Sequence, residues 1–473
     1  MRRSFSNKRL VQGAIATLAA LAMLALPAGV SAATAKQKQE ARKGTLVQLR
    51  GEQGCLVDRS KPSSGCGLAR ALKGPGPFMG SRAIALSPDG KNVYVAASKS
   101  DAIATFRRDA RSGTLTQLKG AAGCIAVKGA SGCATAIGLD GPNSVAVSPD
   151  GRNVYATSRG SNSITVFHRN QASGALSQLP ASAGCISGLP VPVCAAGRAL
   201  LGPDVIVISP NGANVYVGSF FGNAIAVFDR DRASGALTQP GDSSGCIAEA
   251  TSGCAVGIAL GAPEGMAISG DGASVYVASA LSNAVVTLAR DRATGTLTQA
   301  TDGSGCVVNS PLTGCATGVQ LSGANAVAFN PGGDVYVTSL FSNSVTSFTR
   351  ASTGGLTQKK GTFGCLVWLR AVGCSFGRAL RAPEGLAVSP DGANVYAAAF
   401  ANSAIAVLDR GGKSGTVNQK PGRAGCLALR SVPDCTPARA LRGVSSIALS
   451  PDGRYLYSTS FGSNAVDIFR RNK

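Results

Sequence analysis

The chain has 473 residues, with 46 Lys and Arg against 24 Asp and Glu and a formal net charge of +22. This length ordinarily suggests two or three domains, but an internal repeat overrides that expectation. Beyond the first 32 residues no stretch is apolar over the roughly 20 residues that a membrane-spanning helix needs, so we expect no transmembrane segment.

Residues 1–32 are predicted to be a signal peptide, followed by a short linker at residues 33–43. A basic start and an apolar run to about Leu26 precede Val30-Ser31-Ala32, which resembles a cleavage site. "RRSF" at residues 2–5 also resembles part of a twin-arginine signal, but paired cysteines that oxidise after export favour the general secretory route. We therefore expect a secreted or extracytoplasmic protein.

The mature chain remains strongly basic. Without residues 1–32 it holds 42 basic and 24 acidic residues, a charge of +18. This excess favours anionic partners such as wall polymers, lipid head groups or nucleic acid, although a role in solubility alone would also account for it.

A tyrosine recurs at steps of 60 or 61 residues through the rest of the chain. The seven copies are Tyr94, Tyr155, Tyr216, Tyr276, Tyr336, Tyr396 and Tyr457. In the second unit, "SVAVS", "NVYAT", "SITVF" and "ALSQL" read as four strands separated by turns such as "SPDG". Four short strands per unit in seven units predict an all-β, seven-bladed β-propeller of about 60 residues per blade, over residues 44–473.

The two ends of the chain predict how the ring closes. The fourth-strand pattern G-x-[LV]-x-Q follows the third strand in units one to six, but the seventh unit stops after "DIFRRN". The missing copy stands at the N-terminus, as Gly44-Thr45-Leu46-Val47-Gln48. The N-terminal strand is therefore expected to complete the last blade.

The repeat resembles a known family. "SPDG(K/R)NVYVAS", "NAIAVFDRD" and "TGTLTQ" are similar to the YVTN-type repeats of the seven-bladed lactonase-like propellers, which include 6-phosphogluconolactonase-like and carboxymuconate-cyclase-like members. The resemblance covers Gly44 to Lys473 and is specific for the fold, because the matching residues belong to strands and turns. The paired cysteines are not part of the usual family repeat.

The fourteen cysteines form one pair per unit, between the fourth strand and the next first strand. Metal ligation would need thiolates of different blades to meet, and the C-x-x-C spacing of redox motifs is absent. We expect seven local disulfides that stiffen a crown of loops on one rim: Cys55–Cys66, Cys124–Cys133, Cys185–Cys194, Cys246–Cys254, Cys306–Cys315, Cys365–Cys374 and Cys426–Cys435.

A ring of polar residues is expected at the mouth of the central channel, just before each innermost strand. In units one to seven these are Arg82, Asn143, Asp204, Glu264, Asn325, Glu384 and Ser445. Oxygen ligands from Asn143, Asp204, Glu264, Asn325 and Glu384 could hold Ca²⁺ or Mg²⁺, and some six-bladed lactonases resemble this in using an axial Ca²⁺. The alternative is a hydrated polar funnel without an ion.

A second pair of repeat positions is basic in units six, seven and one, which are neighbours in a closed ring. The residues are Arg70, Lys73, Arg378, Arg381, Arg439 and Arg442. Nearby cysteine loops add Trp368, Arg59, Lys61, Arg370, Arg423 and Arg430. A basic sector with an aromatic suits an anion or anionic polymer, while scattered solvated charge is the alternative.

Two further features bear on activity. Phe220, Leu340, Phe400 and Phe461, in the turn between second and third strands, are expected to pack beneath the crown. His168, the only histidine, stands at the exit of a third strand and is expected to point away from the channel mouth, which rules out Ser-His-Asp and Cys-His arrangements. Acid–base work would fall to Glu264, Glu384 and Asp204, with Arg82 as electrostatic partner.

These observations favour an exported, monomeric binding or scaffold module. Its partner would be an anionic polymer, a cell-wall component or another protein. The alternative is a lactone hydrolase of the 6-phosphogluconolactonase type, or a related isomerase, acting at the channel mouth with or without Ca²⁺ or Mg²⁺. Fold by itself does not decide between them.

Overall fold

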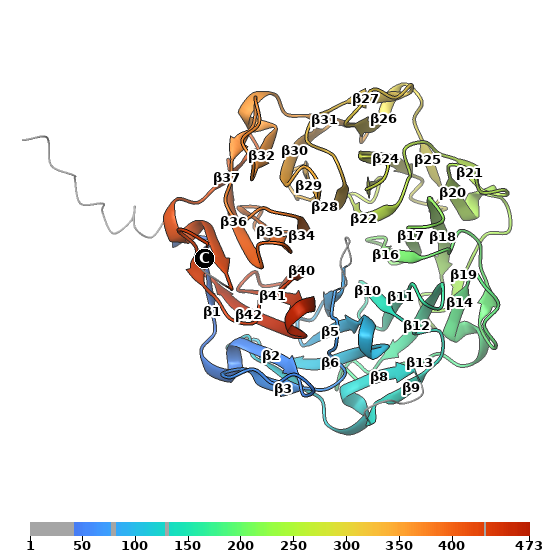
Figure 1. Cartoon of the computed structure of the whole chain (residues 1–473). Coiled ribbons are helices and arrows are strands. Elements are labelled where there is room, and N and C mark those ends of the chain that lie inside the picture. Colours follow the sequence, from blue (N-terminus) through green and yellow to red (C-terminus); the bar gives the residue numbers. More distant parts are fainter. Residues whose placement is uncertain (1–41, 77–81, 128–131, 430–431) are drawn as a thin grey trace, which may run out of the picture. The chain divides into compact units, whose positions relative to one another are not determined.

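The computed structural model describes residues 42–76, 82–127, 132–429 and 432–473. The predicted signal peptide and most of the linker lie outside these residues. Arg42–Lys473 form one compact unit, in which seven six-stranded sheets surround a central axis (Figure 1). The prediction of an all-β, seven-bladed propeller is confirmed.

The first three strands of each blade form an antiparallel meander that runs outward from the axis. The innermost strands are β4 (Ile84–Leu86), β10 (Pro142–Val147), β16 (Pro203–Ile208), β22 (Pro263–Ile268), β28 (Ala324–Phe329), β34 (Pro383–Val388) and β40 (Val444–Leu449). The second strands are β5 (Asn92–Ala97), β11 (Asn153–Ser158), β17 (Asn214–Ser219), β23 (Ser274–Ser279), β29 (Asp334–Ser339), β35 (Asn394–Ala399) and β41 (Tyr455–Ser460). The third strands are β6 (Ala102–Arg108), β12 (Ser163–Arg169), β18 (Ala224–Arg230), β24 (Ala284–Arg290), β30 (Ser344–Arg350), β36 (Ala404–Arg410) and β42 (Ala465–Arg471).

The outer part of each blade differs from the predicted single fourth strand. The first piece pairs with one half of the third strand, as β1 (Leu46–Gln48), β7 (Leu115–Gln117), β13 (Leu176–Gln178), β19 (Leu237–Thr238), β25 (Leu297–Gln299), β31 (Leu356–Gln358) and β37 (Val417–Gln419). The second piece pairs with the other half, as β2 (Cys55–Asp58), β8 (Cys124–Val127), β14 (Cys185–Ser187), β20 (Cys246–Ala248), β26 (Gly303–Val308), β32 (Cys365–Val367) and β38 (Cys426–Ala428).

Short 3-10 turns separate the two pieces in six blades: η1 (Gly51–Gly54), η3 (Gly120–Gly123), η5 (Ala181–Gly184), η6 (Ser243–Gly245), η7 (Gly361–Phe363) and η8 (Gly422–Gly425). Two further 3-10 turns, η2 (Ser98–Ser100) and η9 (Phe461–Ser463), join second to third strands.

A fifth, parallel strand forms the outer edge of every blade. These strands are β3 (Gly67–Ala69), β9 (Ala134–Ala136), β15 (Ala195–Ala196), β21 (Ala255–Val256), β27 (Cys315–Thr317), β33 (Ser375–Phe376) and β39 (Thr436–Pro437). We number the blades 1 to 7 by their innermost strands, β4 to β40.

All seven predicted disulfides are present, with Cα atoms 4.7–4.9 Å apart. Their setting corrects one expectation, because they do not merely stiffen loops on a rim. In blade 1, Cys124 opens β8 and Cys133 directly precedes β9, so the bond joins the outer piece of the fourth strand to the fifth strand. Each disulfide thus holds a two- or three-residue strand on the edge of its sheet.

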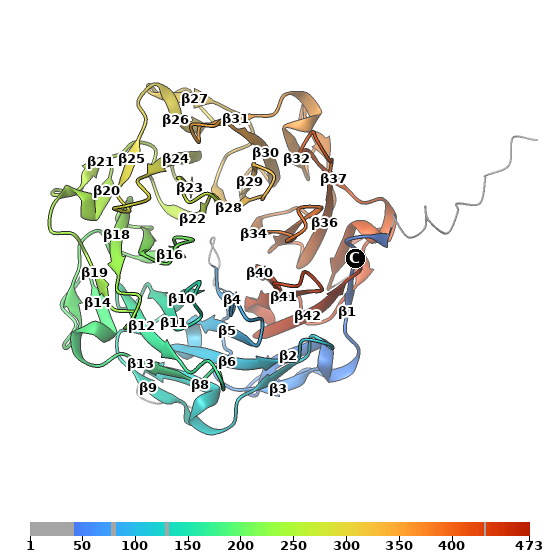
Figure 2. The same ribbon diagram turned by 180° about the vertical axis from the view of Figure 1, so that it is seen from behind.

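The ring closes as predicted. Figure 2 shows β1 and β2 beside β42, and Leu46 pairs with Arg471 while Cys55 pairs with Asp467. Blade 7 therefore contains β40–β42 from the C-terminus and β1–β3 from the N-terminus. Seven hydrophobic clusters of described residues lie between neighbouring blades; in one of them Tyr155 and Ile164 of blade 2 pack with Leu200 and Val215 of blade 3.

The regular spacing of the tyrosines has a physical reason. In blade 1 the Tyr94 hydroxyl donates to the carbonyl of Gly174 and accepts from Arg169 Nε, both at 2.8 Å. Arg169 comes from blade 2 and also pairs with Asp89 in the "SPDG" turn of blade 1. Blades 2, 4, 6 and 7 repeat this Arg–Tyr–Asp contact with the following blade, so the repeat encodes the joints between blades as well as the strands.

Candidate functional site

The axial polar ring is built by β-bulges. In blades 2 to 7 the register between the first and second strands shifts at the ring residue, as between Pro142 and Ser144 or between Pro263 and Gly265. A bulge turns one side chain out of the regular alternation. Gly265 and Gly385 follow two of these bulges, and a Cβ at either would lie within 2.6 Å of a backbone oxygen of the next blade. The inner strands therefore approach closely at this level.

Three members of the ring tie blades together. Asn143 donates to the carbonyl of Asp204 at 3.3 Å and accepts from Thr157. Asn325 donates to the carbonyl of Pro383 at 3.0 Å, and Ser445 donates to the carbonyl of Gly76 at 2.8 Å. These polar groups are buried, and their hydrogen bonds cross from one blade to another.

Asp204 and Glu264 form a buried acidic pair that has one countercharge, Arg159. Arg159 lies 3.1 Å from Asp204 and stacks over the Phe220 ring at 4.6 Å. Burial raises the pKa of Asp204 to about 6, although Arg159 and Asn143 both lower it. Burial, and secondly the charge of Asp204, raise the pKa of Glu264 well above its ordinary value. Neither carboxyl oxygen of Glu264 has a hydrogen-bond partner among the described residues.

Arg159 was missed by the sequence prediction, although a signal was available. It occupies the repeat position of Phe220, Leu340, Phe400 and Phe461. Leu340 is buried as expected, whereas Phe220 and Phe461 are half-buried and lie beside the cations Arg159 and Lys99. A basic residue at a repeat position that is otherwise mostly hydrophobic indicates that an acidic side chain lies nearby in that blade or the next, here Asp204.

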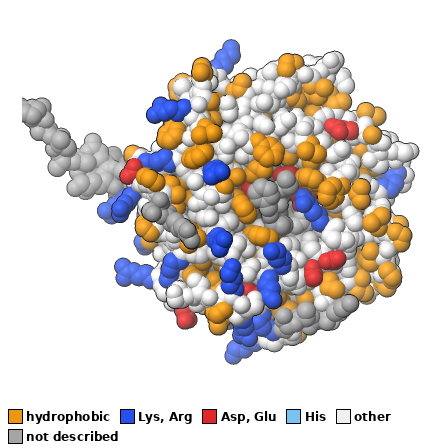
Figure 3. Space-filling model, in the orientation of Figure 1, with side chains coloured by type: hydrophobic (Ala, Val, Ile, Leu, Met, Phe, Trp, Pro, Cys, Tyr) orange, Lys and Arg blue, Asp and Glu red, His pale blue; other side chains and the backbone are white. Residues whose placement is uncertain are grey.

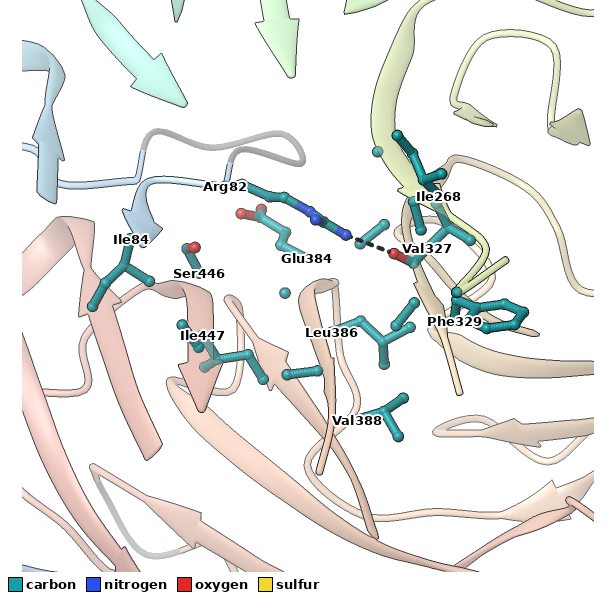
Figure 4. A pocket seen from close by; sticks show the side chains of 18 residues that line it. Arg82, Ile84, Ile268, Val327, Phe329, Glu384, Leu386, Val388, Ser446 and Ile447 are labelled. Carbon is teal, nitrogen blue, oxygen red and sulfur yellow. Dashed lines mark hydrogen bonds between the residues drawn. The ribbon is translucent and has the colours of Figure 1, made fainter. Parts of the chain in front are cut away.

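Arg82 and Glu384 project into the central channel. They line a cavity of about 370 Å³ whose walls are otherwise mostly apolar, with Val327, Leu386 and Ile447 among them (Figure 4). Arg82 reaches from blade 1 to donate to the Val327 carbonyl of blade 5 at 3.1 Å. Burial lowers the pKa of Arg82 to about 10. A carboxylate and a guanidinium beside one apolar cavity can bind a small polar ligand or promote proton transfer.

Several of the predicted Ca²⁺ or Mg²⁺ ligands are already engaged by other groups of the ring. The Asn143 and Asn325 amides are engaged with neighbouring blades, and Asp204 pairs with Arg159. The described part of the chain contains no group of three or more His, Cys, Asp or Glu residues placed to hold a metal. The residues present therefore do not fit a hard cation, which prefers six to eight unengaged oxygen ligands for Ca²⁺.

The predicted basic sector divides into two rows with different roles. Arg70, Arg378 and Arg439 stand in the connections between blades and donate to backbone carbonyls of the blade that follows, as Arg439 does to Leu49, Gly51 and Gly65 at 3.0 Å. Arg198 makes the same contacts in blade 3. These guanidinium groups hold the 3-10 turns and cysteine segments in place.

The second row faces solvent. Lys73, Arg381 and Arg442 are exposed, and Arg381 lies 5.7 Å from the Trp368 ring. Lys61 and Lys99 lie on the same rim, where they contact Gly462 and Phe461. Arg430, which the sequence also assigned here, lies outside the described residues.

A small cavity opens between blades 6 and 7 within this row. It has a volume of about 280 Å³ and is lined by Ala401, Asn402, Ser403, Leu429 and Arg442. Ser403 stands where five other blades have Asn and one has Asp. Arg381 adjoins the cavity, since its backbone N–H donates to Asn402 Oδ1 at 2.7 Å.

His168 is exposed on β12 and pairs across the sheet with Asn153, at the end of the blade opposite the channel mouth. The expectation that it points away from the mouth agrees with this position. The channel mouth of the described structure therefore contains carboxylates, amides and arginines, and the only histidine of the chain is remote from it.

Comparison with known proteins bears on the fold. The model of the family "Lactonase, 7-bladed beta-propeller" matches residues 76–128, 134–184 and 198–313. The resemblance to the lactonase-like seven-bladed propellers is confirmed. No curated protein matches the chain. The matched residues end within blade 4, so the later blades are assigned by their repeat and by the structure.

Solved structures of similar fold share about a fifth of their residues with this chain. A protein of Bacteroides fragilis, provisionally assigned as a 6-phosphogluconolactonase, has 20% identity and a TM-score of 0.51 over 71% of this chain and 81% of its own. A similarly assigned protein of Bacteroides uniformis has 19% identity and a TM-score of 0.51 over 78% and 88%. A Lactobacillus plantarum protein has 19% identity and a TM-score of 0.50 over 75% and 85%. At such identities the likeness shows the fold alone.

Proposed function

We propose that the protein is an exported binding module that recognises anionic partners at the cell surface through its basic rim. The basic rim comprises Lys61, Lys73, Lys99, Arg381 and Arg442, on blades 7, 1 and 6. The observation that carries the proposal is that Lys73, Arg381 and Arg442 are exposed at one repeat position in three adjacent blades.

Several features of the molecule support export and surface binding. Seven disulfides suit an oxidising compartment outside the cytoplasm. None of the described helices is long and apolar enough to cross a membrane. Arg381 beside Trp368 and Arg442 beside the cavity of blades 6 and 7 provide guanidinium groups that can pair with phosphate or carboxylate.

The test compares two variants of equal charge. Lys73→Ala, Arg381→Ala and Arg442→Ala together remove the exposed row, while Lys91→Ala, Arg152→Ala and Arg232→Ala remove three exposed cations near the opposite ends of the blades. Arg378 and Arg439 are left intact because their loss would remove hydrogen bonds between blades. Binding to isolated cell envelopes and to polyphosphate is measured at low and at physiological salt.

We expect the rim variant to bind at least about tenfold more weakly, because it has lost three exposed charges. Its binding should also depend less on salt concentration, because fewer exposed charges remain for salt to screen. The opposite-face variant should bind like the wild type. Equal losses in both variants would mean that net charge, and not the rim, determines binding.

A second candidate function is hydrolysis of a lactone in the channel. The observation in its favour is that Glu384 and Arg82 line one cavity, where a carboxylate could activate water and a guanidinium could stabilise an oxyanion. Turnover of gluconolactones by the wild type and its loss in Glu384→Gln, with Glu264→Gln as the matched buried control, would establish the activity. A wild-type rate of hydrolysis no higher than the uncatalysed rate would reject this function.

A further inference from the structure

At the turns that join second to third strands, the described residues include exposed large hydrophobic side chains in blades 3, 4 and 5. Phe221, Leu281 and Phe341 are the second residues of the turns that join second to third strands, and they are 61, 67 and 63% exposed. The equivalent residues in blades 1, 2, 6 and 7 are Lys99, Gly160, Ala401 and Gly462. We name Phe221, Leu281 and Phe341 the apolar rim.

Glycines in the connections that precede blades 3 and 5 lie against the two aromatic rings of the apolar rim. Gly202 and Gly323 have φ values of 64° and 69°, and a Cβ at either would lie within 2.6 Å of the ring of Phe221 or Phe341. Phe220 packs edge-on against Phe221, with ring centroids 5.0 Å apart. The aromatic rings are thus held on small residues and still expose more than half of their surface.

The apolar rim and the basic rim share one face of the ring. In Figure 3 the Lys and Arg side chains gather to the left of and below the centre, whereas hydrophobic side chains with few charges occupy the upper and right-hand parts. Because Lys99, Phe221, Leu281 and Phe341 hold one position of the repeat, they stand at a similar height on the ring. A flat partner can therefore contact both sets together.

We propose that this face docks on an anionic lipid surface. Phe221, Leu281 and Phe341 would enter the boundary between head groups and acyl chains, while Lys73, Lys99, Arg381 and Arg442 pair with head-group phosphates. The proposal rests on the proposed function and names the partner of the same rim. A soluble polyanion would explain the basic rim alone, because its binding does not remove the apolar rim from water. A lipid surface presents phosphate groups and an apolar interior next to each other, so it can bind both rims.

The experiment uses co-sedimentation of the mature protein with two kinds of vesicle, one of phosphatidylglycerol and phosphatidylcholine in equal parts and one of phosphatidylcholine alone. The apolar variant carries Phe221→Ser, Leu281→Ser and Phe341→Ser. Its matched control carries Leu68→Ser, Phe363→Ser and Phe376→Ser, which also replaces two Phe and one Leu, all about half exposed or more, at the outer edges of blades. Polyphosphate binding and sedimentation velocity are measured for each.

We expect the wild type and the control to bind the anionic vesicles and to leave the neutral ones in solution. The apolar variant should lose at least about tenfold in vesicle affinity, because partial burial of three large side chains contributes several-fold each, and should bind polyphosphate as before. Binding of polyphosphate without binding of vesicles would overturn this inference and leave the proposed function standing. Failure to bind either would reject both.

Two other results would also overturn the inference. If the apolar variant binds anionic vesicles like the wild type, the rings do not enter the lipid and the basic rim acts alone. If the wild type forms a dimer that the same three substitutions abolish, and does not bind vesicles, the apolar rim is a contact between copies of the chain.

Discussion

Arg159 lies 3.1 Å from the carboxylate of Asp204, and the pair joins the second blade of the propeller to the third. Asp204 is 1% exposed, whereas the Arg159 side chain keeps about a quarter of its surface in solvent. The buried carboxylate of Asp204 therefore depends on the partly exposed Arg159 for its charge compensation.

Arg159→Leu should destabilise the protein more at pH 8 than at pH 5. At pH 8 Asp204 is ionised and would lose its countercharge inside the ring, at a cost of about 1–3 kcal/mol after allowance for the solvent exposure of Arg159. At pH 5 Asp204 is largely protonated, because its pKa is about 6. Urea unfolding of this variant and of Arg152→Leu at both pH values measures the difference. An equal loss at both pH values would show that packing on Phe220, and not charge, is what Arg159 contributes.

Asp204→Asn should flatten the dependence of stability on pH. The pKa of Asp204 is raised in the folded state from 3.8 to about 6, so the folded protein binds more protons and stability falls as pH rises from about 4 to 6. The change corresponds to about 3 kcal/mol, at 1.36 kcal/mol per pKa unit. Burial also raises the pKa values of Glu264 and Asp467, which acts on stability in the same direction. Asp434→Asn, which removes an exposed carboxylate, should leave the profile unchanged.

Tyr94→Phe should cost about 1–3 kcal/mol, because it leaves Arg169 Nε and the Gly174 carbonyl without their buried partner. Tyr336→Phe is the matched variant in blade 5. There Arg410 Nε donates to Asp334 at 2.9 Å, so this nitrogen keeps its partner when the Tyr336 hydroxyl and its bond to Gly415 are lost. Unfolding midpoints should fall further for Tyr94→Phe. The reverse order would mean that the tyrosine hydroxyl does not hold the arginine.

Replacement of Cys124 and Cys133 by Ala should lower stability by about 2–3 kcal/mol, the chain-entropy value for a loop of this length. The loosening of the folded structure should be largest at β9. Amide hydrogen exchange of β9 should rise while that of β5 and β6 stays slow, because β9 is a short edge strand attached through the disulfide. An acceleration of exchange in β5 and β6 as large as that in β9 would contradict this picture.

Truncation should show which N-terminal residues contribute to the stability of the ring. A chain that begins at residue 42 should unfold like one that begins at residue 33, because the described contacts that close the ring begin at Gly44, whose carbonyl accepts from the Tyr396 hydroxyl at 2.7 Å. A chain that begins at residue 50 loses β1 and its pairing with β42. Its thermal midpoint should fall by many degrees, and an unchanged midpoint would show that β1 does not close the ring.

The sequence alone determined the blades, their number, the closure by the N-terminal strand and the cysteine pairs. Each of these follows from short-range patterns repeated at a fixed period: turn residues, alternating strands, and cysteines 8 to 11 residues apart. The position of Phe220, Leu340, Phe400 and Phe461 was also visible, but Arg159 in the same row was overlooked.

The tertiary structure decided which polar groups remain available. Arg70 and Arg439 were expected to meet a partner, yet they donate to backbone carbonyls of the next blade, including pairs separated by nearly 400 residues. The division of the fourth strand and the added parallel strand likewise depend on pairing across the blade. Such contacts come from the closure and curvature of the ring, which place residues of different repeats side by side. The separation of one face into a basic and an apolar half has the same origin, because neighbours on a ring are not neighbours in the chain.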